Sequence, residues 1–288
     1  MSNSSVPTKM SNVNYWCGHI AELIVSRTLG VFMGYAVSKS IDEEEKTITW
    51  TISPETIRIY AYLNFWLLVL VGWWLTIYHS HVDLQNDILI EIIGFNSICV
   101  YFDHPPSNYV LPAIWSINYL FLMSYAYTSW LRVHQKFLLG EAKSQNYWLF
   151  TICSGIEVVS FSIFTTIFAV GPDESLLVHM LPFTGLVLGL SILSIKNFFY
   201  YHMTLEFSTF EIRFAIVLTI VHLIASIVKL AFHFNILFGE SLFLTHDYML
   251  LHKFVGGGIW MLTAAIIPIF TALKLRDRAP KLVFQTTY

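Results

Sequence analysis

Charged residues are scarce in this chain, and their scarcity excludes an ordinary soluble domain. Only 12% of the 288 residues are Asp, Glu, Lys or Arg, about half the usual share in a soluble protein. Hydrophobic residues make up 56%, and the mean hydropathy is +0.61. Apolar segments long enough to cross a bilayer recur along nearly the whole length. The composition predicts a polytopic integral membrane protein.

Cysteine and the common chemical motifs are also sparse. Cys17, Cys99 and Cys153 show no CxxC spacing, so we expect neither a disulfide framework nor a cysteine metal site. The chain has no Lys/Arg run, no phosphate-binding glycine loop and no GxSxG elbow. We therefore predict neither a nucleic-acid partner nor an enzyme. The polar first ten residues do not resemble a cleaved signal peptide.

The apolar segments predict eight membrane helices. Seven are clearly apolar: 59–78, 86–102, 110–131, 147–169, 176–198, 212–238 and 248–273. The segment 16–38 is weaker because it contains His19, Glu22 and Arg27, but its other residues are apolar enough to count it. The predicted fold class is all-α, a polytopic membrane helix bundle forming one domain over residues 1–288.

Positive residues predict which side of the membrane each loop faces. Basic residues gather in residues 132–146, at Arg213 and in the tail 274–288. Three loops have neither Lys nor Arg: 103–109, 170–175 and 239–247. The basic side is expected to be cytoplasmic and to hold both termini, residues 1–13 and 274–288.

Residues 39–58 are then expected to form an extracellular loop. Within it, the residues from Thr47 to Ser53 alternate in polarity and are rich in β-branched side chains, which predicts a strand or hairpin. Pro54 is expected to end that strand.

Lys229 is the most unusual residue, because it lies inside the apolar run 213–238 with no acidic residue in that run. A charged ammonium at that depth costs several kcal/mol. Without water a lysine gives up its proton more easily, and the neutral amine can form a Schiff base with an aldehyde. His222, Ser226 and His233 share a helical face with Lys229. This stripe is either a site or a polar seam bonded to neighbouring helices.

Two acidic residues also fall within predicted helices. Glu91 is either the counter-ion of a protonated Schiff base or a carboxylate reached by water near the membrane surface. Glu157 lies between Ser154 and Ser160, and it is either a proton site or hydrogen-bonded to those hydroxyls.

Histidines allow two further interpretations. His19 and His79 lie at the cytoplasmic ends of the first two predicted helices, close to Glu22, where they either relay a proton or are solvated separately. Four histidines and two acids lie toward the outer face: His179, His233, His246, His252, Asp173 and Asp247. No HExxH or similar spacing supports ligation, so no metal is expected.

Several of these features occur in a recognisable order. The chain has His19-Ile20-Ala21-Glu22 in the first helix, His79 closing the second, Glu91 in the third, Trp130-Leu131 ending the fourth and Lys229 in the seventh. From about residue 14 to 238 this order resembles the heliorhodopsins, retinal-binding membrane proteins of inverted orientation.

The resemblance implies a seven-helix rhodopsin-like core over 16–238, with 248–273 as an additional eighth helix. It implies all-trans retinal bound to Lys229 as a Schiff base, with Glu91 as counter-ion and Ser226 nearby. The protein would be a photoreceptor, with light-dependent proton or ion permeation left open by Glu22 and Glu157. Retinal and the lipid bilayer are the expected partners, and a homo-oligomer is left open.

The chain also departs from the family. Glu22 replaces a neutral amide, and Ala225 stands where the family favours a serine, with Ser226 one position later. Two other functions therefore stay open. One is a non-photoactive receptor or transporter in which Lys229 binds an anionic ligand. The other is a metal-dependent membrane hydrolase that uses the outer-face histidines.

Overall fold

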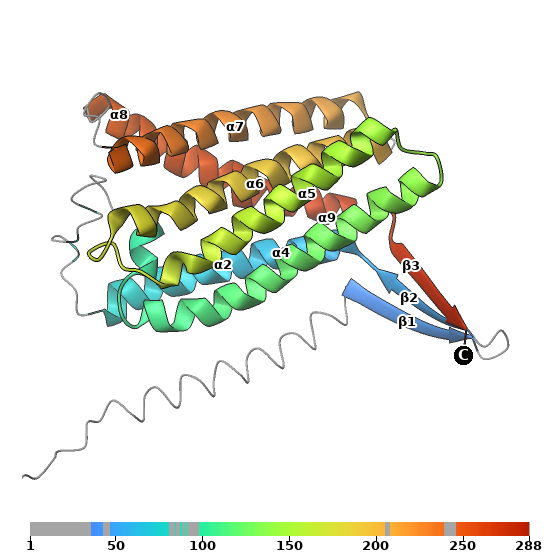
Figure 1. Cartoon of the computed structure of the whole chain (residues 1–288), viewed down its shortest axis with the longest axis horizontal. Coiled ribbons are helices and arrows are strands. Elements are labelled where there is room, and N and C mark those ends of the chain that lie inside the picture. The colour runs from blue at the N-terminus through green and yellow to red at the C-terminus, as the bar shows by residue number, and fades with distance from the viewer. Residues whose placement is uncertain are drawn as a thin grey trace, which may run out of the picture.

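The computed structural model describes residues 36–42, 47–80, 84, 87, 90, 98–204, 208–238 and 246–287. They form a helical bundle with a small sheet at one end (Figure 1). The predicted helix 16–38, with His19 and Glu22, lies outside the described residues, as does Glu91.

Five long helices are followed by a composite last one. They are α2 (Pro54–His79), α4 (Ser107–Leu138), α5 (Ser144–Phe164), α6 (Leu176–Thr204) and α7 (Thr209–Phe238). The last begins as α8 (His246–Leu251), continues through π-helical turns at His252–Ile259 and Leu262–Ile266, and ends as α9 (Ile267–Leu275). Short 3-10 helices cover Ile98–Phe102 and Thr165–Phe168.

Five helices in the described part of the chain are long and apolar enough to cross a membrane. They are Pro54–His79, Ser144–Phe168, Leu176–Tyr200, Thr209–Ile236 and Met249–Leu275. The predicted helical membrane bundle is therefore confirmed in this coarse sense, while the seven-helix core with an eighth helix is not.

A three-stranded antiparallel sheet makes the predicted all-α class incomplete. Strand β1 (Val37–Asp42) pairs with β2 (Thr47–Ile52), which confirms the predicted hairpin. Strand β3 (Leu282–Thr287) adds to the other edge of β2, with Thr49 opposite Gln285. The hairpin ends where predicted, because Ser53 caps α2 by accepting from the Thr56 amide and Pro54 opens that helix.

The predicted third span, 86–102, is wrong. Near the end of α2, the Thr76 hydroxyl lies 3.4 Å from the Tyr101 carbonyl and 3.3 Å from the hydroxyl of Ser107, the first residue of α4. Helix α2 therefore ends at the side of the bundle where α4 begins, and no single crossing separates them. Cys99, Val100 and Phe102 are buried in the bundle. An apolar run does not by itself distinguish burial in protein from burial in lipid.

The loss of this crossing also corrects the predicted sidedness. Strands β2 and β3 are hydrogen-bonded neighbours, so residues 47–52 and 282–287 lie on one side of the membrane (Figure 1). The prediction that 39–58 is extracellular while 274–288 is cytoplasmic cannot hold. The basic loop 132–146 lies at this same end, because Arg132 donates to the Pro280 carbonyl.

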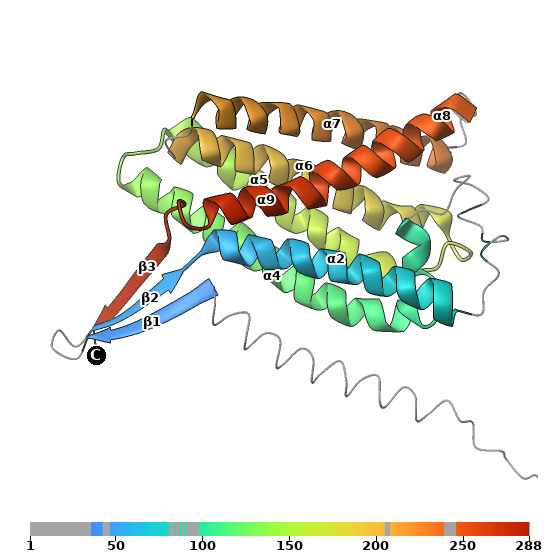
Figure 2. The same cartoon turned by 180° about the vertical axis from the view of Figure 1, so that it is seen from behind.

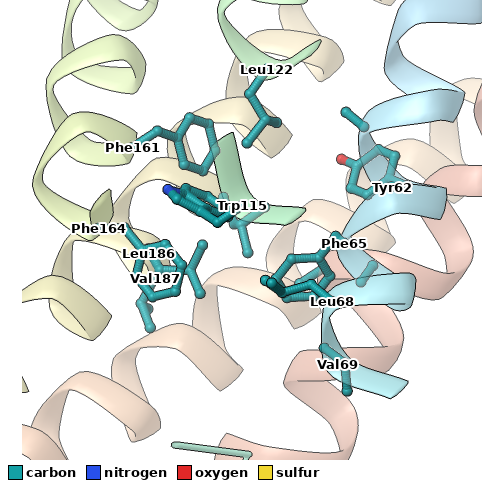
Figure 3. Close-up of a cluster of buried hydrophobic side chains, with 14 of the residues drawn as sticks. Tyr62, Phe65, Leu68, Val69, Trp115, Leu122, Phe161, Phe164, Leu186 and Val187 are labelled. Carbon is teal, nitrogen blue, oxygen red and sulfur yellow. The ribbon is translucent and has the colours of Figure 1, made fainter. Parts of the chain in front are cut away.

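The apolar core lies among α2, α4, α5 and α6. Figure 3 shows Trp115 beside Phe161 and Phe164, with Leu186 close by. The Trp115 and Phe164 ring centroids are 4.5 Å apart, and the indole donates to the hydroxyl of Thr165. In the most apolar stretch of α6, 61% is buried, against 28% in both α7 and the last helix. Among the described helices, the last two are therefore the least buried and form an edge of the bundle.

The sheet predicts that its three strands are reached from one side of a sealed membrane. Lys39→Cys and Lys281→Cys should react alike with an impermeant maleimide, and Glu174→Cys, at the other end of the bundle, should react oppositely. The assay uses sealed vesicles and a background in which Cys17, Cys99 and Cys153 are replaced. Opposite labelling at positions 39 and 281 would contradict the sheet.

Candidate functional site

Lys229 is buried between α7 and the last helix, with 6% of its surface exposed. Its amine donates to the Gly256 carbonyl at 3.3 Å and lies 4.9 Å from the centroid of the Trp260 ring. In the described part of the chain no carboxylate forms an ion pair with this amine. The contacts that the structure describes for this amine are therefore with neutral groups.

Glycine allows the two helices to approach closely at this lysine. A Cβ atom on Gly256 would lie 3.4 Å from the Cα of Lys229 and 2.7 Å from Nδ1 of His252, which leaves no room for a larger residue. Gly256 belongs to the π-helical turns of the last helix. Such turns are rare and occur frequently at functional sites.

The predicted polar stripe on α7 is buried along its whole length. The exposed fractions of His222, Ser226 and His233 are 1%, 3% and 4%. Ser226 accepts hydrogen bonds from the Ser191 hydroxyl at 2.9 Å and from the Trp260 indole at 3.2 Å. The stripe therefore joins α7 to both α6 and the last helix.

Further contacts continue the stripe in both directions. His222 Nδ1 and the Thr263 hydroxyl are hydrogen-bonded at 3.0 Å. At the other end, the ring of His252 stacks on Phe232 with centroids 3.7 Å apart. The centroid of the His233 ring lies 6.5 Å from that of His252. Both interpretations of the stripe stay open, since it contains a buried amine and also bonds to neighbouring helices.

The outer-face histidines do not gather around one point. His179 lies with Asp103 at the end of the bundle away from the sheet, with Nε2 to Oδ1 at 3.3 Å, whereas His233 and His252 lie beside Lys229. Over the described residues, no group of three or more His, Cys, Asp or Glu side chains could hold a metal ion. The side chains of His246 and Asp247 are outside that description.

Glu157 forms an ion pair with Lys196, which the sequence did not predict. The two side chains bond directly in the buried interior, and the Lys196 amine also donates to the Ser129 hydroxyl at 3.2 Å. The nearby Ser154 instead donates to the carbonyl of its own helix at Phe150. Lys196 is only 1% exposed, so its amine lies inside the bundle.

A second buried ion cluster lies at the sheet end. Glu55 pairs with Arg58 at 2.8 Å and with Arg132 at 3.1 Å, and all three side chains are at most 3% exposed. The Arg132 guanidinium lies 3.8 Å from the centroid of the Tyr200 ring. Sequence reasoning missed this cluster because it began the second helix at residue 59 and ended the fourth at 131. The available signal was an acid and a base three residues apart just after Pro54.

His79 is the exposed last residue of α2, and its ring lies 4.3 Å from that of Trp74. The predicted pairing of His79 with His19 lies outside the described residues. So does the predicted role of Glu91.

At the same end of the bundle, Asp103 is buried beside His179. Burial, together with the negative charges of Asp87 and Asp173, raises the pKa of Asp103 well above its ordinary value. His179 Nδ1 is hydrogen-bonded to the Val170 carbonyl. The carboxyl group of Asp103 is therefore protonated more readily than an exposed aspartate.

The bundle and its buried charges define a helical integral membrane protein with a buried amine. No protein-family model, curated protein or solved structure matches this chain.

Breaking the Glu157–Lys196 pair should strongly destabilise the bundle. Glu157→Gln leaves a buried ammonium without its carboxylate, and the loss of one partner of a buried pair costs about 3–5 kcal/mol. Glu141→Gln is the control, because Glu141 forms an exposed pair with Lys136, and such pairs contribute about 0–1 kcal/mol. Thermal unfolding in detergent measures both. The double variant Glu157→Leu/Lys196→Met should recover most of the loss, and a fully stable Glu157→Gln protein would contradict this account.

Asp103 should make stability depend on pH. Because its pKa is higher in the folded state than the ordinary 3.8, the folded state binds the proton more tightly. The free energy of unfolding should therefore be highest in acid and fall as pH rises from about 4 through the folded-state pKa. Asp103→Asn should remove this part of the fall, whereas Glu174→Gln, exposed in a nearby loop, should keep it. The thermal midpoints of the parent protein and of both variants are measured across this pH range. An Asp103→Asn protein with the same pH dependence as the parent would contradict the prediction.

Proposed function

We propose that this protein is a retinal-binding photoreceptor of the membrane, in which Lys229 carries all-trans retinal as a Schiff base. The observation that supports the proposal is the buried Lys229 amine, whose contacts are the neutral Gly256 carbonyl and the Trp260 ring. A buried amine that forms no ion pair with a carboxylate of the described residues is suited to act as a nucleophile.

The proposed step is a condensation. The Lys229 nitrogen attacks the aldehyde carbon, a carbon–nitrogen double bond forms, and the carbonyl oxygen leaves as water. Glu91 is proposed to stabilise the protonated Schiff base, because a nearby anion favours the charged form. Light would isomerise the polyene and shift the bundle between two conformations. Proton or ion permeation through Glu157 is not part of the proposal, because that residue is paired with Lys196.

The proposal of retinal binding is supported by the residues that surround Lys229, and not by the order of the helices along the chain. Because the third predicted span is wrong, each helix from α4 onward stands one place earlier than in the predicted rhodopsin-like core. Lys229 is also followed by a further helix long enough to cross the membrane, Met249–Leu275.

Trp260 determines how a polyene could be accommodated. A cavity of about 290 Å³ begins at His222, and Ser226 and the Trp260 indole lie between this cavity and the lysine. A polyene bound to Lys229 would extend into the cavity if the indole moved aside. Trp260 is therefore proposed to contact the chromophore.

Reconstitution with all-trans retinal tests the proposal. The purified protein should gain an absorption band beyond that of free retinal, and borohydride reduction should fix a retinyl group on the peptide that contains Lys229. Lys229→Ala should gain no band, whereas Lys253→Ala, which removes an exposed lysine from the last helix, should behave like the parent protein. Retinyl groups spread over surface lysines would overturn the proposal.

A separate measurement tests the assignment of Glu91 as the counter-ion. If the pigment forms and Glu91→Gln shifts its absorption maximum, the carboxylate stabilises the Schiff base. An unchanged maximum would show that Glu91 does not.

A receptor or transporter without a chromophore is the second candidate. It is favoured by the position of Trp260, because a small anion bound to Lys229 needs less space than a polyene. In that case retinal would not attach to the lysine, and Lys229→Met would abolish binding of the anion while Lys229→Arg would retain it.

A further inference from the structure

The three-stranded sheet is attached to the ends of two helices that are suited to cross a membrane. Strand β2 ends at Ile52, just before α2 begins at Pro54, and β3 begins at Leu282, shortly after α9 ends at Leu275. Both helices belong to segments long and apolar enough to span a bilayer. Figures 1 and 2 show the strands running obliquely outward from this end of the bundle. The part of the sheet next to the helices therefore lies close to the membrane surface.

The register of the strands places five described side chains on one face of the sheet. Lys39 is paired with Trp50, and Trp50 with Phe284. Ile52 and Leu282 are paired with each other, two positions along the same strands. Directly paired residues share a face, and residues two apart on a strand do so as well. We call this surface, formed by Lys39, Trp50, Ile52, Leu282 and Phe284, the aromatic face.

The opposite face is mostly polar over the residues that the structure describes. It carries Ser38, Ser40, Thr49 and Thr51, together with Val283. Ser38, Ser40 and Val283 are exposed. The sheet is therefore amphipathic, as is common when one face of an antiparallel sheet meets water and the other an apolar surface.

The aromatic face is the one turned toward the bundle. Next to the helices, Leu282 has no exposed surface and Ile52 packs against the apolar core. Farther from the helices on the same face, Trp50 is 39% exposed and Phe284 is 36% exposed. Protein thus covers this face at its base, and the bundle that provides the cover is itself surrounded by lipid. Where the cover ends, the same face meets the bilayer.

Lys39 and Trp50 form a pair suited to the headgroup layer of a membrane. The Lys39 amine lies 5.3 Å from the centroid of the Trp50 ring, and both side chains are exposed. Tryptophan gathers at membrane–water interfaces because its ring is apolar and its N–H is polar. A lysine there lays its apolar stem along the surface and extends its ammonium toward the phosphates. Lysine is in contrast depleted in protein–protein interfaces, so the pair favours lipid over a second protein.

We propose that the aromatic face binds the surface of the bilayer in which the bundle lies. Trp50 and Phe284 lie among the phospholipid headgroups, and the Lys39 ammonium lies near their phosphates. The opposite face, with Ser38 and Ser40, is in water. The sheet then holds the first residues of α2 and the end of the last helix at a fixed depth in the membrane.

Two neighbouring positions on β3 test which face meets the lipid. The full chain is studied in phosphatidylcholine nanodiscs, with single cysteines at Phe284→Cys or Val283→Cys carrying a nitroxide label in the background without native cysteines. Collisions with oxygen, which concentrates in lipid, should exceed those with a water-soluble nickel chelate at position 284. The order should be reversed at position 283. A label at 284 that collides mainly with the chelate would overturn the proposal.

The same measurement on β1 separates the effect of the face from that of the strand. Lys39→Cys should behave like the label at position 284, and Ser40→Cys like the label at 283, because their positions belong to opposite faces. A label at 284 that is screened from oxygen and from the chelate alike would show that protein covers the aromatic face. That result would also overturn the proposal.

A double variant tests the two residues assigned to the headgroup layer. Trp50→Ser/Lys39→Ser should remove the excess of oxygen collisions at position 284, whereas Ser38→Ala/Ser40→Ala, on the opposite face, should keep it. The spectral line shape of the label at position 283 reports whether the sheet is intact. If that line shape is unchanged in Trp50→Ser/Lys39→Ser and the label at 284 still collides mainly with oxygen, Trp50 and Lys39 do not hold the sheet on the membrane.

Discussion

The carboxylate of Glu55 is the group on which the arrangement of the bundle depends most. It pairs with Arg58 of its own helix and with Arg132 of α4, while Arg132 also donates to the Pro280 carbonyl and stacks on Tyr200 of α6. One buried charge thus connects α2, α4, α6 and the segment that leads into β3. Isolated ions are very costly in an apolar interior, so these elements must meet in this geometry for any of the charges to be tolerated.

A contrast between the two halves of the bundle explains where ligands can bind. Helices α2, α4, α5 and α6 pack around large rings such as Trp115 and Phe161 (Figure 3). Helix α7 and the last helix approach closely at Gly256, and they stay in contact on either side of it through the Phe232–His252 stack and the His222–Thr263 hydrogen bond. The buried amine and the cavity of about 290 Å³ both lie beside these two helices.

Local patterns in the sequence predicted local structure well. Alternating β-branched residues predicted the hairpin, Pro54 marked its end, and the helical spacing of His222, Ser226 and Lys229 predicted a buried polar face. Properties that depend on distant partners could not be predicted in this way. The apolar run 86–102 has the composition of a membrane span, and the Glu157–Lys196 pair joins residues on different helices. The β3 strand is recognisable chiefly through its pairing with β2.

The pairing of β2 with β3 has a consequence for biosynthesis. The two strands are separated by more than two hundred residues of chain and by every long helix that the structure describes. The edge of β2 that pairs with β3 therefore stays unpaired until residues 282–287 have been synthesised, and contacts between such distant segments form slowly. A chain whose synthesis stops before β3 would therefore expose an unpaired strand edge to chaperones or to aggregation.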